Sequence, residues 1–354
     1  MSQTINIQEN LEAIKLVEGD NFICDLPAIE SEYSKLLANQ SSVGIKIMSI
    51  VGGFISSLAF LGFLFISGIY ESEMGLIICG TLLIAGSILL NIKYARLIID
   101  TLSISAYVIG CCLLMFGLTE FDFDESIISL FLIILAISTL AITQTYMLSF
   151  IAVLMINGCF LFLIADNHLF NLIHLYNAVL MIGATLWFLN EARLIKTNAI
   201  ISRLYFPVRI GLIISVICGL ISVGKRDLFA IEYIWLSSVI TIPLAIYIIN
   251  KILNVMEVND TNTKIKILVA SLFILLPTSL SPAISGALII ILLSFLVNYK
   301  TSFAIGVIAF IYFISQYYYD LNFTLLTKSL ILFFSGLVFL AFFLFTYKKF
   351  KSNE

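Results

Sequence analysis

Charged residues are scarce in this chain, and their scarcity excludes a water-soluble fold. Only 12% of the 354 residues are Asp, Glu, Lys or Arg, whereas 61% are apolar. A soluble domain carries about 25% charged residues, and about 45–50% of its residues are apolar. The mean hydropathy of +1.09 agrees with the low charge. The sequence therefore predicts a protein that crosses a membrane many times.

Sequence motifs of known chemistry are missing as well. The chain has no Walker A sequence, no Gly-x-Gly-x-x-Gly, no His-Glu-x-x-His and no Gly-x-Ser-x-Gly, the patterns of nucleotide, dinucleotide, zinc and acyl-transfer sites. Its two histidines are His168 and His174, and none of its six cysteines belongs to a Cys-x-x-Cys pair. A metal ion needs three or four converging ligands. We therefore expect no catalytic residues, no cofactor and no metal ion.

Apolar stretches give the expected number of membrane crossings. Eight of the stretches that lack Asp, Glu, Lys and Arg suit one crossing each, since a transmembrane helix needs about 20 apolar residues. Two further stretches are too long for one helix, and each contains a break, at Thr143-Gln144-Thr145 and from Pro277 to Pro282. The predicted fold is an all-α, polytopic transmembrane helical bundle with about 12 spans. The ten stretches are 47–70, 74–92, 101–119, 126–165, 167–190, 210–224, 233–250, 267–299, 301–319 and 329–347.

Basic residues predict the orientation of the bundle. If the N-terminus is cytoplasmic, 16 of the 19 Lys and Arg residues fall in cytoplasmic segments, and only Lys225, Arg226 and Lys328 fall outside. Lys and Arg are retained on the cytoplasmic side, whereas Asp and Glu have little influence on topology. The sequence thus predicts cytoplasmic N- and C-termini in a multi-pass protein of the cell inner membrane of a bacterium.

The chain divides into three predicted segments. Residues 1–46 form a cytoplasmic N-terminal tail with short amphipathic helices, residues 47–347 the transmembrane helical domain, and residues 348–354 a basic cytoplasmic C-terminus. The tail has a net charge of −4, which makes it a poor ligand for nucleic acid. The lipid bilayer is an expected partner, and nucleic acid is not.

Neutral polar residues within the spans are candidates for a solute path. Asn157 lies in the fifth predicted span and Asn177 in the sixth. Such residues can form hydrogen bonds between helices, or they can line the route of a solute. A carboxylate deep in a span would be typical of proton-coupled carriers, and its absence here argues against ion-coupled transport.

The break from Pro277 to Pro282 leaves two alternatives for the stretch 267–299. Between Lys266 and Lys300, each limb would have about 14 residues, too short for a hydrocarbon core about 30 Å thick. The limbs are either short spans whose flanking lysines reach the interface, or a re-entrant hairpin whose tip lies at membrane depth. In the second case Pro277, Ser279, Ser281 and Pro282 would belong to the solute path.

The stretch from Tyr318 to Ser329, Tyr-Tyr-Asp-Leu-Asn-Phe-Thr-Leu-Leu-Thr-Lys-Ser, precedes an apolar helix with Gly336. Together with Gly52-Gly53-Phe54 and the segment 61–64, it resembles an uncharacterised bacterial membrane family that is known only as a domain of unknown function. The resemblance implies a second membrane protein as partner, of the type with a Gly-Asp-Tyr-x-x-Leu-x-Tyr (GDYXXLXY) motif. It supplies no assigned active site.

Aromatic and charged residues gather near the end of the chain, on a predicted external connection. Read physically, the tyrosines form an interfacial belt or a surface for a partner. The candidate contacts are Tyr317, Tyr318, Tyr319, Asp320 and Lys328. We expect a non-catalytic subunit of a membrane complex. The alternative is a transporter or channel for a small or apolar solute, and an enzyme ranks third because catalytic groups are not clustered.

Overall fold

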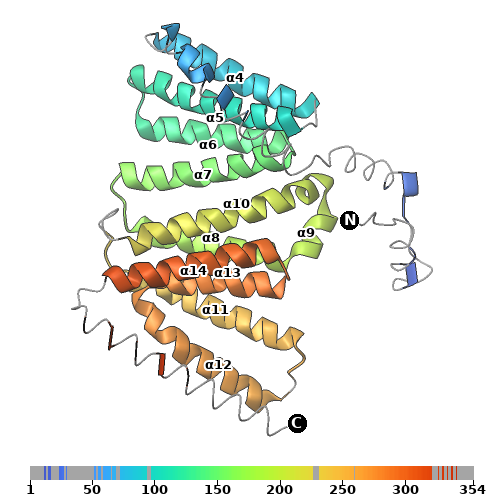
Figure 1. Ribbon diagram of the computed structural model, residues 1–354, viewed down its shortest axis with the longest axis vertical. Helices are drawn as coiled ribbons and strands as arrows, with labels where there is room; N and C mark the ends of the chain where they lie inside the picture. The colour runs from blue at the N-terminus through green and yellow to red at the C-terminus, as the bar shows by residue number, and fades with distance from the viewer. Residues whose placement is uncertain are drawn as a thin grey trace.

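The computed structural model describes residues 72–93, 97–225, 231–258 and 260–320 without interruption, and scattered positions within 12–68 and 326–340. Every regular element in this part of the chain is helical, so the all-α prediction is confirmed (Figure 1). The elements are α4 (Glu73–Lys93), α5 (Leu97–Glu120), α6 (Glu125–Ile142), α7 (Tyr146–Asp166), α8 (Leu172–Leu189), α9 (Glu191–Thr197), α10 (Ala199–Gly224), α11 (Trp235–Val255), α12 (Thr261–Leu275), the 3-10 helix η2 (Leu276–Leu280), α13 (Pro282–Leu296) and α14 (Lys300–Asp320).

Nine helical segments within the described residues are long and apolar enough to cross a membrane. One of them joins α12 to η2 over Thr261–Leu280. Helix α13 has 15 residues, about 22 Å at a rise of 1.5 Å per residue. The predicted spans 47–70 and 329–347 lie mostly outside the described residues, so the count of about 12 spans stays a prediction.

Both predicted breaks are confirmed, and each has a local cause. Helix α6 ends at Ile142, and Thr143 already has an extended backbone with φ −100° and ψ 128°. Pro277 stands at the start of η2, and Pro282 is the first residue of α13. Proline has no backbone N–H, so it suits the first turn of a helix but interrupts one that has already begun.

The first limb of the stretch 267–299 is longer than the sequence suggests. Helix α12 begins at Thr261, before Lys264 and Lys266, because the Asp260 side chain accepts hydrogen bonds from the backbone N–H groups of Asn262 and Thr263. With this cap the limb reaches 20 residues, enough for a full crossing. The predicted length of about 14 residues is therefore wrong for the first limb, which has 20 residues. For the second limb, α13, the prediction is close to the observed 15 residues.

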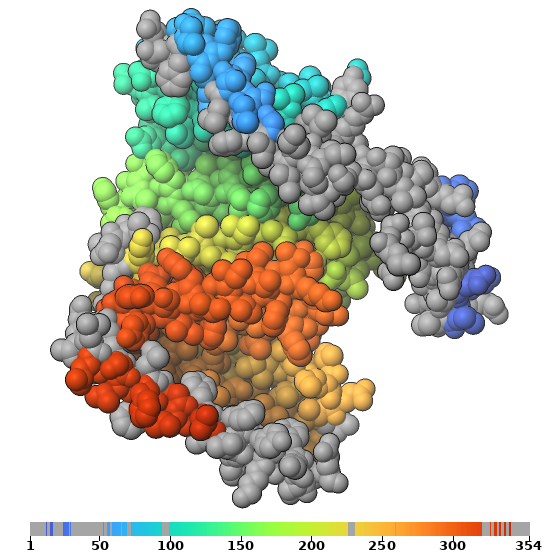
Figure 2. Space-filling model, viewed as in Figure 1, coloured from blue at the N-terminus to red at the C-terminus, as the bar shows by residue number. Residues whose placement is uncertain are grey.

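The helices are stacked in a row, which has a second layer where α8 lies behind α10 and α13 behind α14 (Figure 1). Successive helices run in opposite directions, from the α4–α5 pair at one end of the row to α12 at the other. Figure 2 shows the row as filled volumes, with α10 between α7 and α14 on the face drawn. One hydrophobic core joins α8, α10, α11, α13 and α14, and a second joins α4, α5, α6 and α7.

The alternating directions give the bundle two ends, which we call end A and end B. End A contains the connections 143–145, 190–198, 256–258 and 297–299, and end B contains 121–124, 167–171, 231–234 and residue 281 (Figure 1). At end A, Arg203 donates a hydrogen bond to Gln144 over 3.2 Å. At end B, the Ser126 hydroxyl donates to Asp166 over 2.8 Å. In the predicted orientation, end A is cytoplasmic.

The larger core is closed in its middle. A Cβ atom at Gly286 of α13 would lie 2.4 Å from Met181 Cε and 2.6 Å from Leu220 Cδ1, so the ends of these two side chains fill the space that glycine leaves between α13, α8 and α10. Deeper in the same core, a void of about 10 Å³ has an entirely apolar lining that includes Met181, Ile213 and Ile290. A water molecule needs about 10–15 Å³ and polar partners. This part of the core is therefore dry.

Candidate functional site

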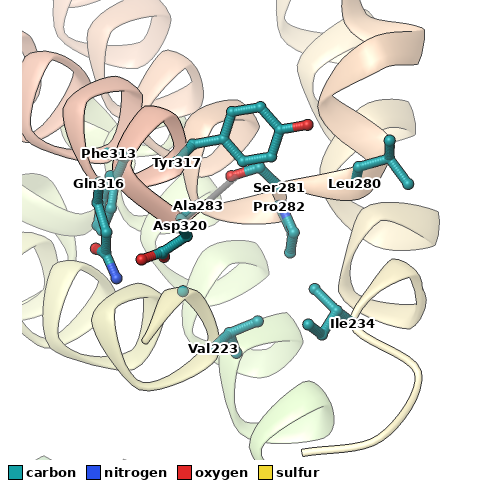
Figure 3. Close-up of a pocket in the computed structure, with 11 residues that line it drawn as sticks. Val223, Ile234, Leu280, Ser281, Pro282, Ala283, Phe313, Gln316, Tyr317 and Asp320 are labelled. Carbon is teal, nitrogen blue, oxygen red and sulfur yellow. The ribbon is translucent and has the colours of Figure 1, made fainter. Parts of the chain in front are cut away.

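A pocket of about 50 Å³ opens at end B, and we call it the end-B pocket (Figure 3). It lies where α10 ends, where α13 begins and beside the last turns of α14. The pocket brings together Ser281 and Pro282, expected on a solute path, and Tyr317 and Asp320, expected at a partner contact. The full lining is Val223, Gly224, Ile234, Leu280, Ser281, Pro282, Ala283, Phe313, Gln316, Tyr317 and Asp320.

Contacts at the helix ends hold the walls of the end-B pocket. The Ser238 hydroxyl of α11 donates to the carbonyl oxygen of Ser279 over 2.9 Å, which fixes η2 against α11. One turn deeper, the hydroxyls of Thr241 and Ser285 are 2.7 Å apart and join α11 to α13. Gly224 has no side chain to fill the space, and a Cβ there would lie 3.7 Å from Gln316 Oε1. These contacts make the pocket a built part of the fold.

Gln316 is the polar residue of this pocket that the sequence analysis missed. Both its Oε1 and Nε2 atoms are buried and have no hydrogen-bond partner in the described structure. A buried polar group without a partner costs about 1–3 kcal/mol. Gln316 and Asp320 are four residues apart on α14 and so share one face of the helix, and Figure 3 shows both side chains directed toward the end of α10. In the sequence, Gln316 could have been recognised from its spacing of four residues to Asp320 at the end of an apolar stretch.

The other solute-path candidates lie elsewhere. Asn177 donates from Nδ2 to the carbonyl oxygen of Gly219 over 2.9 Å, which ties α8 to α10. Asn157 donates to Val153 within α7 over 2.8 Å. Pro277 and Ser279 belong to η2 but do not line the pocket. Of the six solute-path candidates, Ser281 and Pro282 line the end-B pocket, and the other four do not.

The candidate partner contacts divide into two groups. Tyr317 and Asp320 line the end-B pocket. The Tyr318 and Tyr319 rings meet edge to face with centroids 5.7 Å apart, and the Tyr319 side chain is 75% exposed. Lys328 lies outside the described residues. Among the described candidates for the partner contact, Tyr319 is thus the most exposed aromatic side chain.

Arg209 forms a second site, at end A, that the sequence analysis also missed. The sequence suggests a cytoplasmic connection for Arg209, but α10 begins at Ala199 and carries this arginine inside the bundle, where it is 2% exposed. Its Nη1 atom lies 3.4 Å from Glu191 Oε2 of α9. Its guanidinium carbon lies 3.7 Å from the centre of the Tyr299 ring. A buried cation in a membrane protein is a default candidate for function, and here its charge is compensated by a carboxylate and aromatic faces.

His174 joins helices at end B. Its Nε2 atom lies 2.9 Å from the carbonyl oxygen of Glu232, which can only accept, so Nε2 carries the proton. Nδ1 lies 2.7 Å from the Ser237 hydroxyl and shares a hydrogen bond with it. The ring thus connects α8 with α11 through Ser237 and with the connection before α11 through Glu232. Within the described ranges, no group of three or more His, Cys, Asp or Glu residues is placed to hold a metal ion.

Comparison with protein families gives one match. The family described as "Domain of unknown function (DUF4401)" matches residues 44–349. The chain belongs to this family. The expected relationship to an uncharacterised family is therefore confirmed. Comparisons with curated proteins and with solved structures found no match.

The DUF4401 match includes every site described above. It contains both the end-B pocket and Arg209, and it leaves out residues 1–43 and 350–354. The matched range is close to the predicted transmembrane domain, 47–347. Because this family has no assigned function, the role of its member here has to be argued from the geometry.

Proposed function

We propose that this DUF4401 chain is a non-catalytic, membrane-integral subunit of a multi-protein assembly in the bacterial inner membrane. The closed core carries the proposal. Secondary transporters bind their solutes near the middle of the membrane, between segments that move. In this chain Gly286 lies against Met181 and Leu220, and the void farther along the same core holds about 10 Å³.

End B supplies the proposed surface for the partner. Tyr319 is 75% exposed and stacks edge to face with Tyr318. Tyrosines are enriched among the residues that dominate binding energies at interfaces. The partner that the family relationship favours is a second membrane protein with a GDYXXLXY motif, and the bilayer surrounds both proteins.

Crosslinking in native membranes tests this proposal. We expect the wild-type chain, crosslinked and purified in mild detergent, to carry a GDYXXLXY protein identified by peptide sequencing. Replacing both Tyr318 and Tyr319 with Ala should abolish the co-purification and leave the protein level unchanged. Tyr247→Ala is the matched control, because Tyr247 is 53% exposed on α11. The proposal would be overturned if the wild-type chain purified without a partner, or if Tyr247→Ala lost the partner as completely as the double variant.

Transport of a small solute is the second candidate, and the end-B pocket favours it. The pocket holds two of the expected solute-path residues, Ser281 and Pro282, beside the unpaired carboxamide of Gln316. A route from this pocket would have to open the contact of Gly286 with Met181. Solute uptake into proteoliposomes of the purified chain, lost in a variant that crosslinks α13 to α8 at these positions, would establish transport.

A further inference from the structure

We infer that the end-B pocket binds a small primary ammonium group. The size of the pocket limits the ligand first. Its volume is about 50 Å³, which accommodates about three or four water-sized groups. A methylammonium or ethylammonium head fits this space, whereas a nucleotide or a sugar does not.

The charge of the lining favours a cation. Asp320 is the one formally charged side chain among the residues that line the pocket. Helix α10 ends at this place, and the last carbonyl groups of a helix carry partial negative charge. Helix α13 begins here, but its first residue is Pro282, which has no N–H to offer. The formal charge of the lining and the end of α10 therefore both favour a cation.

The individual polar groups suit an ammonium ion better than a metal ion. Its N–H groups can donate to the Asp320 carboxylate and to the Ser281 hydroxyl, and the Gln316 side chain has to turn for its buried, unpaired Oε1 to accept as well. The aromatic rings of Phe313 and Tyr317 also line the pocket, and aromatic faces attract cations of this kind. Divalent cations take six or more oxygen ligands, several of them carboxylate, and this pocket has one carboxylate.

Two sources can supply the ammonium group at a membrane surface. One is a soluble alkylamine, and the other is the headgroup of an ethanolamine phospholipid. Asp320 is exposed, so the pocket is accessible from the surface at its carboxylate. The chemistry at the pocket is the same for both sources, and lipid composition distinguishes them.

Binding of ¹⁵N-methylammonium to the full chain in lipid nanodiscs tests the inference. We expect saturable NMR line broadening and a saturable rise in Tm, which tetramethylammonium and Na⁺ at equal ionic strength do not produce. Asp320→Asn and Gln316→Leu should each weaken binding at least tenfold. Asp122→Asn removes the same charge from the 121–124 connection at the same end and should leave binding unchanged.

A space-filling variant provides a second measurement that does not alter the polar groups. A Cβ at Gly224 would make ordinary contacts, 3.6 Å from Ala283 Cβ, so Gly224→Ala should fold normally and weaken binding by narrowing the pocket. Competition by phosphatidylethanolamine, seen as weaker methylammonium binding than in nanodiscs without this lipid, would support the inference with the lipid as source. Equal binding in both lipids would support it with a soluble amine as source. Absence of saturable binding in the wild type, equal binding of Na⁺, or equal loss in Asp122→Asn would overturn it.

Discussion

Arg209 carries a positive charge into the bundle at end A, where a carboxylate and aromatic rings surround it. Glu191 comes from α9, Tyr205 and Phe206 from α10 itself, and Tyr299 from the connection before α14. Burying an ion costs several kcal/mol unless a partner compensates it. The arginine therefore stabilises the arrangement in which α9 folds back against α10 and the start of α14.

Glu191→Gln should destabilise the chain by about 2–3 kcal/mol, because it leaves a buried cation without its carboxylate. This lies below the usual cost of breaking a buried pair, since the Glu191 side chain is 31% exposed. The double variant Arg209→Met with Glu191→Gln should cost less than the sum of the single changes. Unfolding in one detergent measures the difference, and Glu257→Gln, exposed at the same end, is the control. Additive costs in the double variant would show that the pair contributes nothing.

Gly286 gives a second prediction at the scale of single residues. Gly286→Ala places a Cβ against Met181 and Leu220 and should destabilise the chain by about 1 kcal/mol, the low end of the usual cost of overpacking, because the ends of these flexible side chains can shift. Gly183→Ala on α8 is the matched control, because no atom lies within 4 Å of its Cβ position. Met181→Ala should recover part of the loss. If both glycine variants have the same Tm, the core is looser than the distances indicate.

Single residues of the sites were only partly predictable from the sequence. Asp320 and Tyr317 stand out because they are polar or aromatic at the end of an apolar stretch. Arg209 was treated as the boundary of such a stretch, and its ring partner Tyr299 lies 90 residues farther along the chain. Gln316 carries no charge and so did not interrupt the apolar pattern. Burial and long-range contacts decide the role of both residues, and neither is visible in local composition.

At the scale of elements, local sequence signals predicted where a long apolar stretch is interrupted. They predicted less well the residue at which a helix begins. Thr143-Gln144-Thr145 and the Pro277–Pro282 region stop helices through backbone chemistry that is written in neighbouring residues. The start of α12 depends on Asp260, whose carboxylate caps the helix upstream of two lysines. A prediction from charge alone places the start of α12 after Lys264 and Lys266. The Asp260 cap places it before them, at Thr261.

The position of η2 makes a prediction about accessibility. In a variant without native cysteines, Ser279→Cys at end B should react with a membrane-impermeant thiol reagent in intact spheroplasts. Thr197→Cys at end A should react only after permeabilisation, because the predicted orientation makes end A cytoplasmic. The reverse pattern would show an inverted topology. Reaction of Ser279→Cys with small reagents alone would place the hairpin tip at membrane depth.

At the scale of the whole molecule, the row of helices presents a long apolar perimeter. Large apolar side chains such as Ile66, Phe273 and Ile308 are at least 68% exposed. Only 6% of the residues in an 18-residue window of the segment Thr261–Leu280 are buried within the described structure. Lipid tails solvate such surfaces, and other membrane helices can cover them. The apolar perimeter therefore fits a protein surrounded by lipid or by other membrane helices.

The composition of the particle in its own membrane tests the account most directly. Polymer-extracted native nanodiscs of the tagged chain, weighed by native mass spectrometry, should contain a GDYXXLXY membrane protein in constant ratio to the chain. The ratio should not change with expression level, since a subunit is retained by its specific contacts. Particles that contain this chain alone, as monomer or homo-oligomer, would contradict the assignment as a subunit.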